Sequence, residues 1–257
     1  ILIKMINLFN KAIFSLGITI MLFAASKSIA SSDSHTPVLK LRFHLVQDLE
    51  MQQKGVDMVN WITPEMIRDT VMPDLNKIWS DAEIRWELAG VHNASTKSAG
   101  RQETVDYLLR ARRNEQGKSD PERIKKLKNI LPLAARDPNI INIYVIPYLG
   151  ITSQGNASPR QNIVIMGQWS DKSSRGQSPP QKCILSQNGA PKKGSFSRTT
   201  AHELGHILGL RHPKKSNKTR SQNLLMGGGS SVPGVNLTNA EILIAREGAF
   251  LLEYAQR

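Results

Sequence analysis

The stretch "TTAHELGHILGLRHPKK", residues 199 to 215, contains His202, His206 and His212, half of the six histidines in the chain. Residues four positions apart on a helix lie on one face, so His202 and His206 can direct both imidazoles at one metal ion. Gly209 can adopt a left-handed conformation that ends the helix, and the returning chain then offers His212 as a third ligand. Three neutral imidazoles with an open fourth position are typical of catalytic zinc, which lowers the pKa of its water to about 7.

Glu203 directly follows the first of these histidines, and its carboxylate can reach a zinc-bound water without binding the metal. There it can take a proton from the water and pass it to the leaving amine of a peptide. The other interpretation is a set of unrelated surface or core histidines, but five residue types at this spacing are a rare coincidence. The remaining histidines, His35, His44 and His92, show no ligand spacing. The sequence therefore predicts one catalytic Zn²⁺ held by the three clustered histidines, with Glu203 as the base.

The pattern H-E-x-x-H-x-x-G-x-x-H, read from His202 to His212, resembles the zinc motif of metzincin metalloproteases. That superfamily carries a methionine turn after the third histidine, and Met226 in "NLLMGGG" matches it, although by itself a methionine is more often a core residue. The resemblance implies that Met226 forms an apolar floor below the metal and is not a ligand. It also implies a mixed α/β (α+β) catalytic domain with a twisted mixed sheet, an active-site helix and a C-terminal helix.

The resemblance in layout extends from about residue 38 to 257, while sharp identity is confined to 202–226. "YLGITSQGNASPRQNIVIMG" is placed like the substrate-binding edge strand of the superfamily and the strand after it, and "LTNAEILIAREGA" like its final helix. "SRTTAHELGHILGLRH" is similar to the pappalysin-like group, but the cysteines and acidic segment common there are missing, and the turn and last helix resemble matrixins. No tyrosine closely follows Met226, so the tyrosine ligand of some branches is not expected.

Hydrophobic periodicity predicts strands and helices mixed along a single domain. Strands are expected at 38–47, 83–88, 141–149 and 161–167, with a short exposed edge strand between the last two. A helix capped by Thr63, with Pro64 in its first turn, should run to Trp79, and Pro73 is expected to kink it. Further helices are expected over a basic insertion at about 101–132 and at about 198–209 and 237–255. The polar stretch 168–196 predicts a long surface loop.

The first thirty residues differ in composition from the rest of the chain. Two lysines precede an apolar run from Ala12 to Ala25, and small residues end at Ala30. This pattern predicts a secretory signal peptide, 1–30, and a single catalytic domain, 31–257. The apolar run is short for a membrane span, so the mature protein is expected to be secreted or periplasmic without a stable span; an uncleaved anchor is the alternative.

Cysteine and charge set further expectations. The one cysteine, Cys183, cannot form an internal disulfide, and because "QKCILS" does not match the matrixin cysteine switch, a buried or loop thiol is expected. Loss of 1–30 removes three lysines and lowers the formal net charge from +13 to +10. Two basic segments, 168–198 and 211–220, flank the zinc helix in sequence. The basic residues that could lie at the rim of the active-site cleft are Lys182, Lys192, Lys193, Arg211, Lys214 and Lys215. These charges either solvate the surface or attract acidic substrates or an anionic envelope; no aromatic-interleaved basic motif predicts nucleic-acid binding.

These patterns predict a secreted or periplasmic zinc-dependent endopeptidase that acts on protein or peptide substrates. The substrate would lie extended along an edge strand while Glu203 activates the water. Two alternatives stay open. One is a non-catalytic binding protein with a structural zinc, which normally has four protein ligands. The other is a zinc hydrolase that acts on a non-peptide bond.

Overall fold

The computed structural model describes residues 35–96, 136–150, 154–171, 179–186, 194–213, 223–227 and 234–256. The chain divides into two compact units, Ile1–Thr36 and Pro37–Arg257, and the fold is that of the second unit. The signal peptide predicted at 1–30 and the basic insertion predicted at 101–132 lie outside the described residues. None of the helices in the described part of the chain has the length and apolar character needed to cross a membrane.

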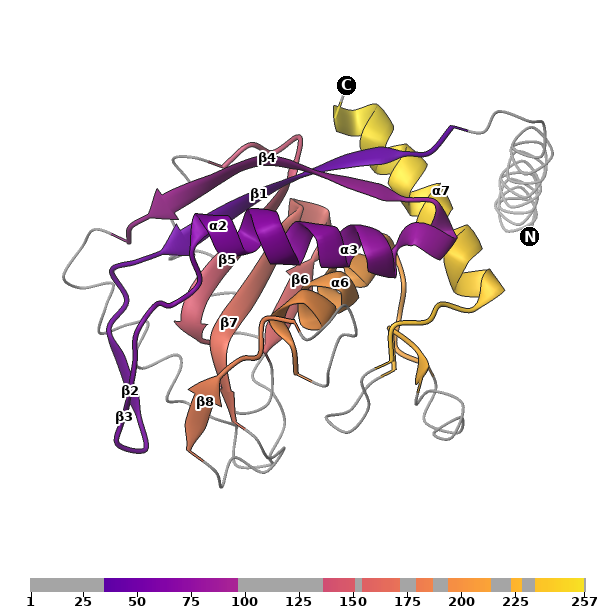
Figure 1. Ribbon diagram of the computed structural model, residues 1–257. Helices are drawn as coiled ribbons and strands as arrows, with labels where there is room; N and C mark the ends of the chain where they lie inside the picture. The colour runs from indigo at the N-terminus through magenta and orange to yellow at the C-terminus, as the bar shows by residue number, and fades with distance from the viewer. Residues whose placement is uncertain are drawn as a thin grey trace, which may run out of the picture. The chain divides into compact units, whose positions relative to one another are not determined.

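A mixed six-stranded sheet forms the centre of this unit (Figure 1). Its strands are β1 (Val38–Val46), β4 (Arg85–Ala94), β5 (Ile141–Tyr148), β6 (Gly155–Ser158), β7 (Ile163–Asp171) and β8 (Pro180–Lys182). The order is β4-β1-β5-β7-β6, in which the first four strands run parallel. β6 and β8 pair antiparallel with successive parts of the remaining edge of β7. The fold is therefore of the mixed α/β (α+β) class, as the sequence predicted.

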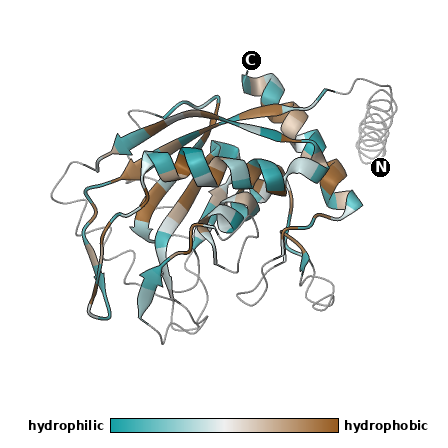
Figure 2. Ribbon diagram, in the orientation of Figure 1, coloured by the Kyte–Doolittle hydropathy of each residue, from teal (hydrophilic) through white to brown (hydrophobic). Residues whose placement is uncertain are grey.

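The central strand β5 is buried along its whole length and contributes to two cores. Ile143 and Val145 belong to the core shared with the helices, whereas Tyr144 and Ile146 belong to the second, because successive side chains of a strand point to opposite faces. Such apolar runs appear brown in Figure 2. The second core is completed by a hairpin of β2 (Met51–Gln53) and β3 (Val56–Met58).

Helices pack on the first core from one face of the sheet (Figure 1). They are a π-helical turn η1 (Ile67–Val71), α3 (Met72–Ile78) and α6 (Phe196–Ile207). The short helix α2 (Pro64–Met66), which has no buried residue, leads into η1. Short 3-10 turns follow α3 and β6, namely η2 (Ser80–Ala82) and η3 (Pro159–Gln161). Thr63 caps the first helix as predicted, its Oγ1 accepting from Met66 N at 3.3 Å. Beside Pro73, which has no N–H, the helix widens instead of ending, and Met72 N–H donates to Ile67 O five residues back.

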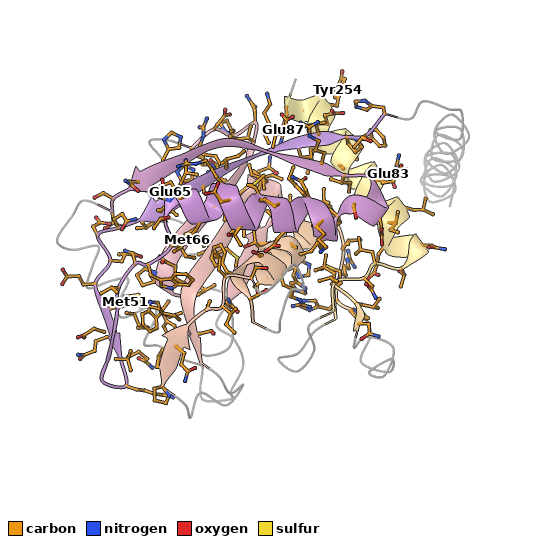
Figure 3. The ribbon with its side chains drawn as sticks, viewed as in Figure 1. Met51, Glu65, Met66, Glu83, Glu87 and Tyr254 are labelled. Carbon is orange, nitrogen blue, oxygen red and sulfur yellow. The ribbon has the colours of Figure 1, made fainter. Side chains whose placement is uncertain are left out.

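The C-terminal helix α7 (Asn239–Gln256) packs against β1 and η2. Glu253 Oε1 accepts from Val38 N at 3.2 Å at the start of β1. Arg246 forms an ion pair with Glu83, which is labelled in Figure 3. Gly248 allows a close approach to α6, since a Cβ there would lie 2.5 Å from Leu208 O. These contacts hold α7 against the end of the helix that carries the clustered histidines.

Two predicted elements need correction. The strand predicted at 83–88 is β4, which starts at Arg85 and runs on to Ala94 because it pairs with β1 along its length. The stretch 168–196 is not one loop: β7 continues to Asp171, β8 pairs with it, and α6 begins at Phe196. The polar composition of this stretch gave no strand pattern. Its strand residues are stabilised by backbone hydrogen bonds between β7 and β8 at the edge of the sheet.

Candidate metal centre

The helix α6 positions two of the predicted ligands and ends where the sequence requires. Ser195 caps its start, with Oγ accepting from Arg198 N at 3.2 Å. At the other end Gly209 adopts φ +90°, and Leu210 N–H donates to Gly205 O at 2.9 Å. Gly209 N–H also donates to His206 O at 3.1 Å, which completes a Schellman-type helix end. The predicted left-handed glycine is confirmed, and it turns the chain back toward the helix so that the third histidine can approach.

The three predicted ligand histidines converge through their Nε2 atoms. His212 Nε2 lies 3.0 Å from His202 Nε2 and 3.1 Å from His206 Nε2. Zinc–nitrogen bonds of about 2.0–2.1 Å at tetrahedral angles place ligand nitrogens ~3.3 Å apart, close to these separations. Burial decreases along the set, from buried His202 to partly buried His206 to exposed His212, so one side of the group is open to solvent. In the described part of the chain, no other His, Cys, Asp or Glu belongs to a cluster with this geometry.

The outer ring nitrogens fix the tautomer of two of these histidines. His202 Nδ1 lies 2.7 Å from Leu225 O, and His206 Nδ1 lies 2.8 Å from Leu210 O. A carbonyl only accepts, so each Nδ1 carries the proton and each Nε2 presents its lone pair to the shared space. Burial lowers the pKa of His202 to about 3, which keeps its imidazole neutral near pH 7. Neutral imidazoles with convergent lone pairs repel one another unless a cation lies between them, so this donor set fits Zn²⁺.

The predicted methionine lies in a turn and is fully buried. Gly227 N–H donates to Leu224 O at 3.1 Å, which closes the turn that contains Met226. Met226 packs against α6 at Gly205, where a Cβ would lie 2.5 Å from the Met226 sulfur. The carbonyl of Leu225, the preceding residue, accepts the hydrogen bond from His202. The turn is therefore joined to the histidine group by packing and by a hydrogen bond.

Glu203 lies between α6 and the edge strand β6. It is 7% exposed, and the backbone N–H of Ala157 donates to its carboxylate. Burial raises the pKa of Glu203 to about 7, while the Ala157 hydrogen bond and the positive charge of Arg198 oppose this rise. Gly155, two residues before Ala157, leaves the space that the carboxylate occupies. The base predicted from the sequence thus contacts the strand at the end of the sheet order.

Gly155→Ala is expected to displace the Glu203 carboxylate, because the new Cβ would lie 2.6 Å from Glu203 Cγ and 2.7 Å from Oε1. A displacement near 1 Å at a reacting group can cost about 10²-fold in turnover. We expect a loss of that size in peptide cleavage with zinc content unchanged, measured by kinetics and metal analysis. Gly90→Ala, whose Cβ meets only the His92 ring, is the control; equal activity in both variants would contradict the prediction.

Two residues in this region had not been predicted to take part. Arg198, one turn before His202, is 9% exposed and donates to carbonyls outside its own helix. Gln154 Nε2 donates to Gly194 O at 3.0 Å and to Cys183 Sγ at 2.9 Å, which ties the start of the edge strand to the loop before α6. In the sequence, Arg198 and Gln154 are marked only as polar residues close to the predicted active-site helix and the predicted edge strand.

The remaining predicted residues lie away from the histidine group or outside the described residues. Cys183 is buried, as expected, and burial raises the pKa of its thiol to about 12, so it is not a reactive thiolate at neutral pH. His44 is also buried, stacks on Tyr144 and hydrogen-bonds Asn142 at 3.0 Å. Among the basic candidates Lys182 and Arg211 are exposed. The others, Lys192, Lys193, Lys214 and Lys215, fall outside the described residues.

No protein-family model matches the sequence, and a search of curated proteins also finds no match.

Proposed function

We propose that this chain is an exported zinc-dependent endopeptidase of the metzincin type. The observation that carries the proposal is the convergence of three imidazole Nε2 atoms next to a buried carboxylate that contacts an edge strand. Metal ligands, a base and a strand able to pair with an extended peptide are the parts that metal-assisted hydrolysis of a peptide bond needs, and this combination supports the proposal. Export is proposed from the sequence of residues 1–30 alone.

His202, His206 and His212 would hold the metal. Zinc bound there would polarise a carbonyl oxygen and lower the pKa of a water. Glu203 would take the proton of the attacking water and deliver it to the leaving nitrogen, so that the carboxylate is regenerated. The Ala157 N–H keeps the carboxylate in place between these two transfers. β6, at the end of the sheet order, offers backbone groups with which an extended substrate can pair.

Ligand number favours catalysis over the alternative of a structural zinc. A structural site is normally closed by four protein ligands, whereas the group in the described residues has three and includes exposed His212. A water and a substrate could approach the metal from the side of the exposed His212. A preference for acidic peptides is proposed from the basic segments that flank the zinc helix in sequence.

The proposal is tested by incubating the purified, zinc-loaded protein with a proteome-derived peptide library and sequencing the products. We expect new peptide ends that disappear after chelation and return when zinc is restored. Identical product sets with and without chelator would contradict a zinc peptidase. An intact library from a zinc-containing protein would favour the binding protein or a hydrolase of another bond.

A further inference from the structure

Arg198 is a buried cation beside the candidate metal centre that is neither one of the proposed ligands nor the proposed base. It lies on α6 one helical turn before His202 and is 9% exposed. Its Nε donates to Gly234 O at 3.1 Å, and its Nη2 donates to Leu225 O at 2.9 Å. Both acceptors are backbone carbonyls from segments that follow the third histidine. Burying a guanidinium costs free energy, which these two hydrogen bonds and the attraction of the nearby Glu203 carboxylate offset.

The two carbonyls belong to chain segments that are paired with each other. Leu225 N–H donates to Asn236 O at 2.7 Å, and Asn236 N–H donates to Asn223 O at 3.0 Å. Gly234 packs so closely on Asn223 that a Cβ there would lie 2.2 Å from a backbone carbon. Arg198 therefore holds a paired unit, the methionine turn and the segment from Gly234, against the helix that carries two histidines. Only a planar fork of donors reaches two separate carbonyls in this way, which a lysine cannot reproduce.

Leu225 O accepts from two groups at once. It accepts from Arg198 Nη2 at 2.9 Å and from His202 Nδ1 at 2.7 Å. The position of this oxygen sets the orientation of the His202 ring and keeps its proton on Nδ1, so that Nε2 faces the other histidines. Displacement of Leu225 O would rotate the ring or release its tautomer. The same displacement would move Met226, the next residue along the turn.

We infer that Arg198 is a positioning residue of the metal centre, which acts by holding Leu225 O where it orients His202. This inference rests on the proposed zinc site. It assigns to Arg198 no contact with the metal or the substrate. The two diverging donors of the guanidinium, Nε and Nη2, position Leu225 O, and a positive charge without this geometry would not be enough to do so.

The test compares Arg198→Lys with Arg246→Lys. The second variant is a matched control, because Arg246 also binds a backbone carbonyl, that of Ala82, but joins α7 to η2 away from the histidines. Three quantities are measured: zinc affinity by competition with a chelating dye, the visible spectrum of the Co²⁺-substituted protein, and the His202 tautomer in the metal-free protein by ¹⁵N NMR. For Arg198→Lys we expect zinc affinity to fall about 10–100-fold. We also expect a changed cobalt spectrum and a mixed His202 tautomer, with all three unchanged in Arg246→Lys.

The outcomes separate this inference from the proposed function. A wild-type protein that binds no zinc would refute the metal site itself. A folded Arg198→Lys protein with wild-type zinc affinity, cobalt spectrum and His202 tautomer would overturn only the role of Arg198. If Arg198→Lys and Arg198→Gln both fail to fold while Arg246→Lys folds, Arg198 is a residue of general stability, and the inference is equally overturned.

Discussion

Replacing Glu203 by Gln is expected to lower kcat for peptide cleavage by about 10²–10⁴-fold, the usual contribution of a general acid–base group. Glutamine has the same shape, and its Oε1 can still accept from the Ala157 N–H that binds the native carboxylate. It cannot take a proton from water, however. Steady-state kinetics together with metal analysis should therefore show lost turnover with unchanged zinc content, the sign of a removed base rather than a damaged site.

Glu65→Gln is the matched control for this experiment. Glu65 is an exposed glutamate in the first turn of α2, labelled in Figure 3, and it pairs with Arg68 at 2.8 Å on the surface. An exposed pair of this kind contributes little to stability, so this variant should cleave peptides like the wild type. Near-normal turnover in Glu203→Gln would assign the base to another residue.

His212→Ala is expected to abolish cleavage and to weaken zinc binding strongly. His212 is the residue whose Nε2 lies near both other ligand nitrogens, at 3.0 and 3.1 Å, and its loss leaves two ligands. The decrease in affinity should exceed the roughly 10–100-fold that follows the loss of a hydrogen-bond partner of a ligand. Zinc titration against a competing chelator measures it.

The control for this variant is His92→Ala. His92 is exposed on β4, stacks on His44 at 5.9 Å and is not in the histidine group. This variant should keep its zinc and its activity. Full zinc affinity in His212→Ala would show that the third ligand had been assigned to the wrong residue.

Local signals in the sequence were enough to predict the elements that carry the site. The i, i+4 spacing of His202 and His206 and the glycine at 209 predicted both the helix and its end, and α6 differs from the prediction by two residues at each end. The apolar run at 141–149 predicted β5, because a fully buried strand needs no polar face. The short edge strand predicted before 161 was confirmed as β6, although its residues are buried or half-buried and not exposed as predicted.

What escaped prediction depends on contacts between distant parts of the chain. The role of Gly155 follows from Glu203 packing on it, and these residues are 48 positions apart in sequence. Arg198 looks locally like an ordinary polar residue in the first turn of a helix; the positioning role inferred for it depends on its hydrogen bonds to Gly234 O and Leu225 O, which are distant in sequence. The β2–β3 hairpin was also missed, because its turn at Lys54 and Gly55 uses positive φ values of 53° and 76° without the Asn or Asp that usually signals such turns.

X-ray absorption spectroscopy at the zinc edge of the purified protein measures the number and type of the metal ligands. We expect one zinc per chain with three imidazole nitrogens at about 2.0–2.1 Å and one light-atom ligand from solvent. The same measurement on His212→Ala should show one imidazole fewer. A fourth protein ligand, a sulfur at about 2.3 Å, or the absence of zinc after growth with the metal would contradict a catalytic site built from His202, His206 and His212.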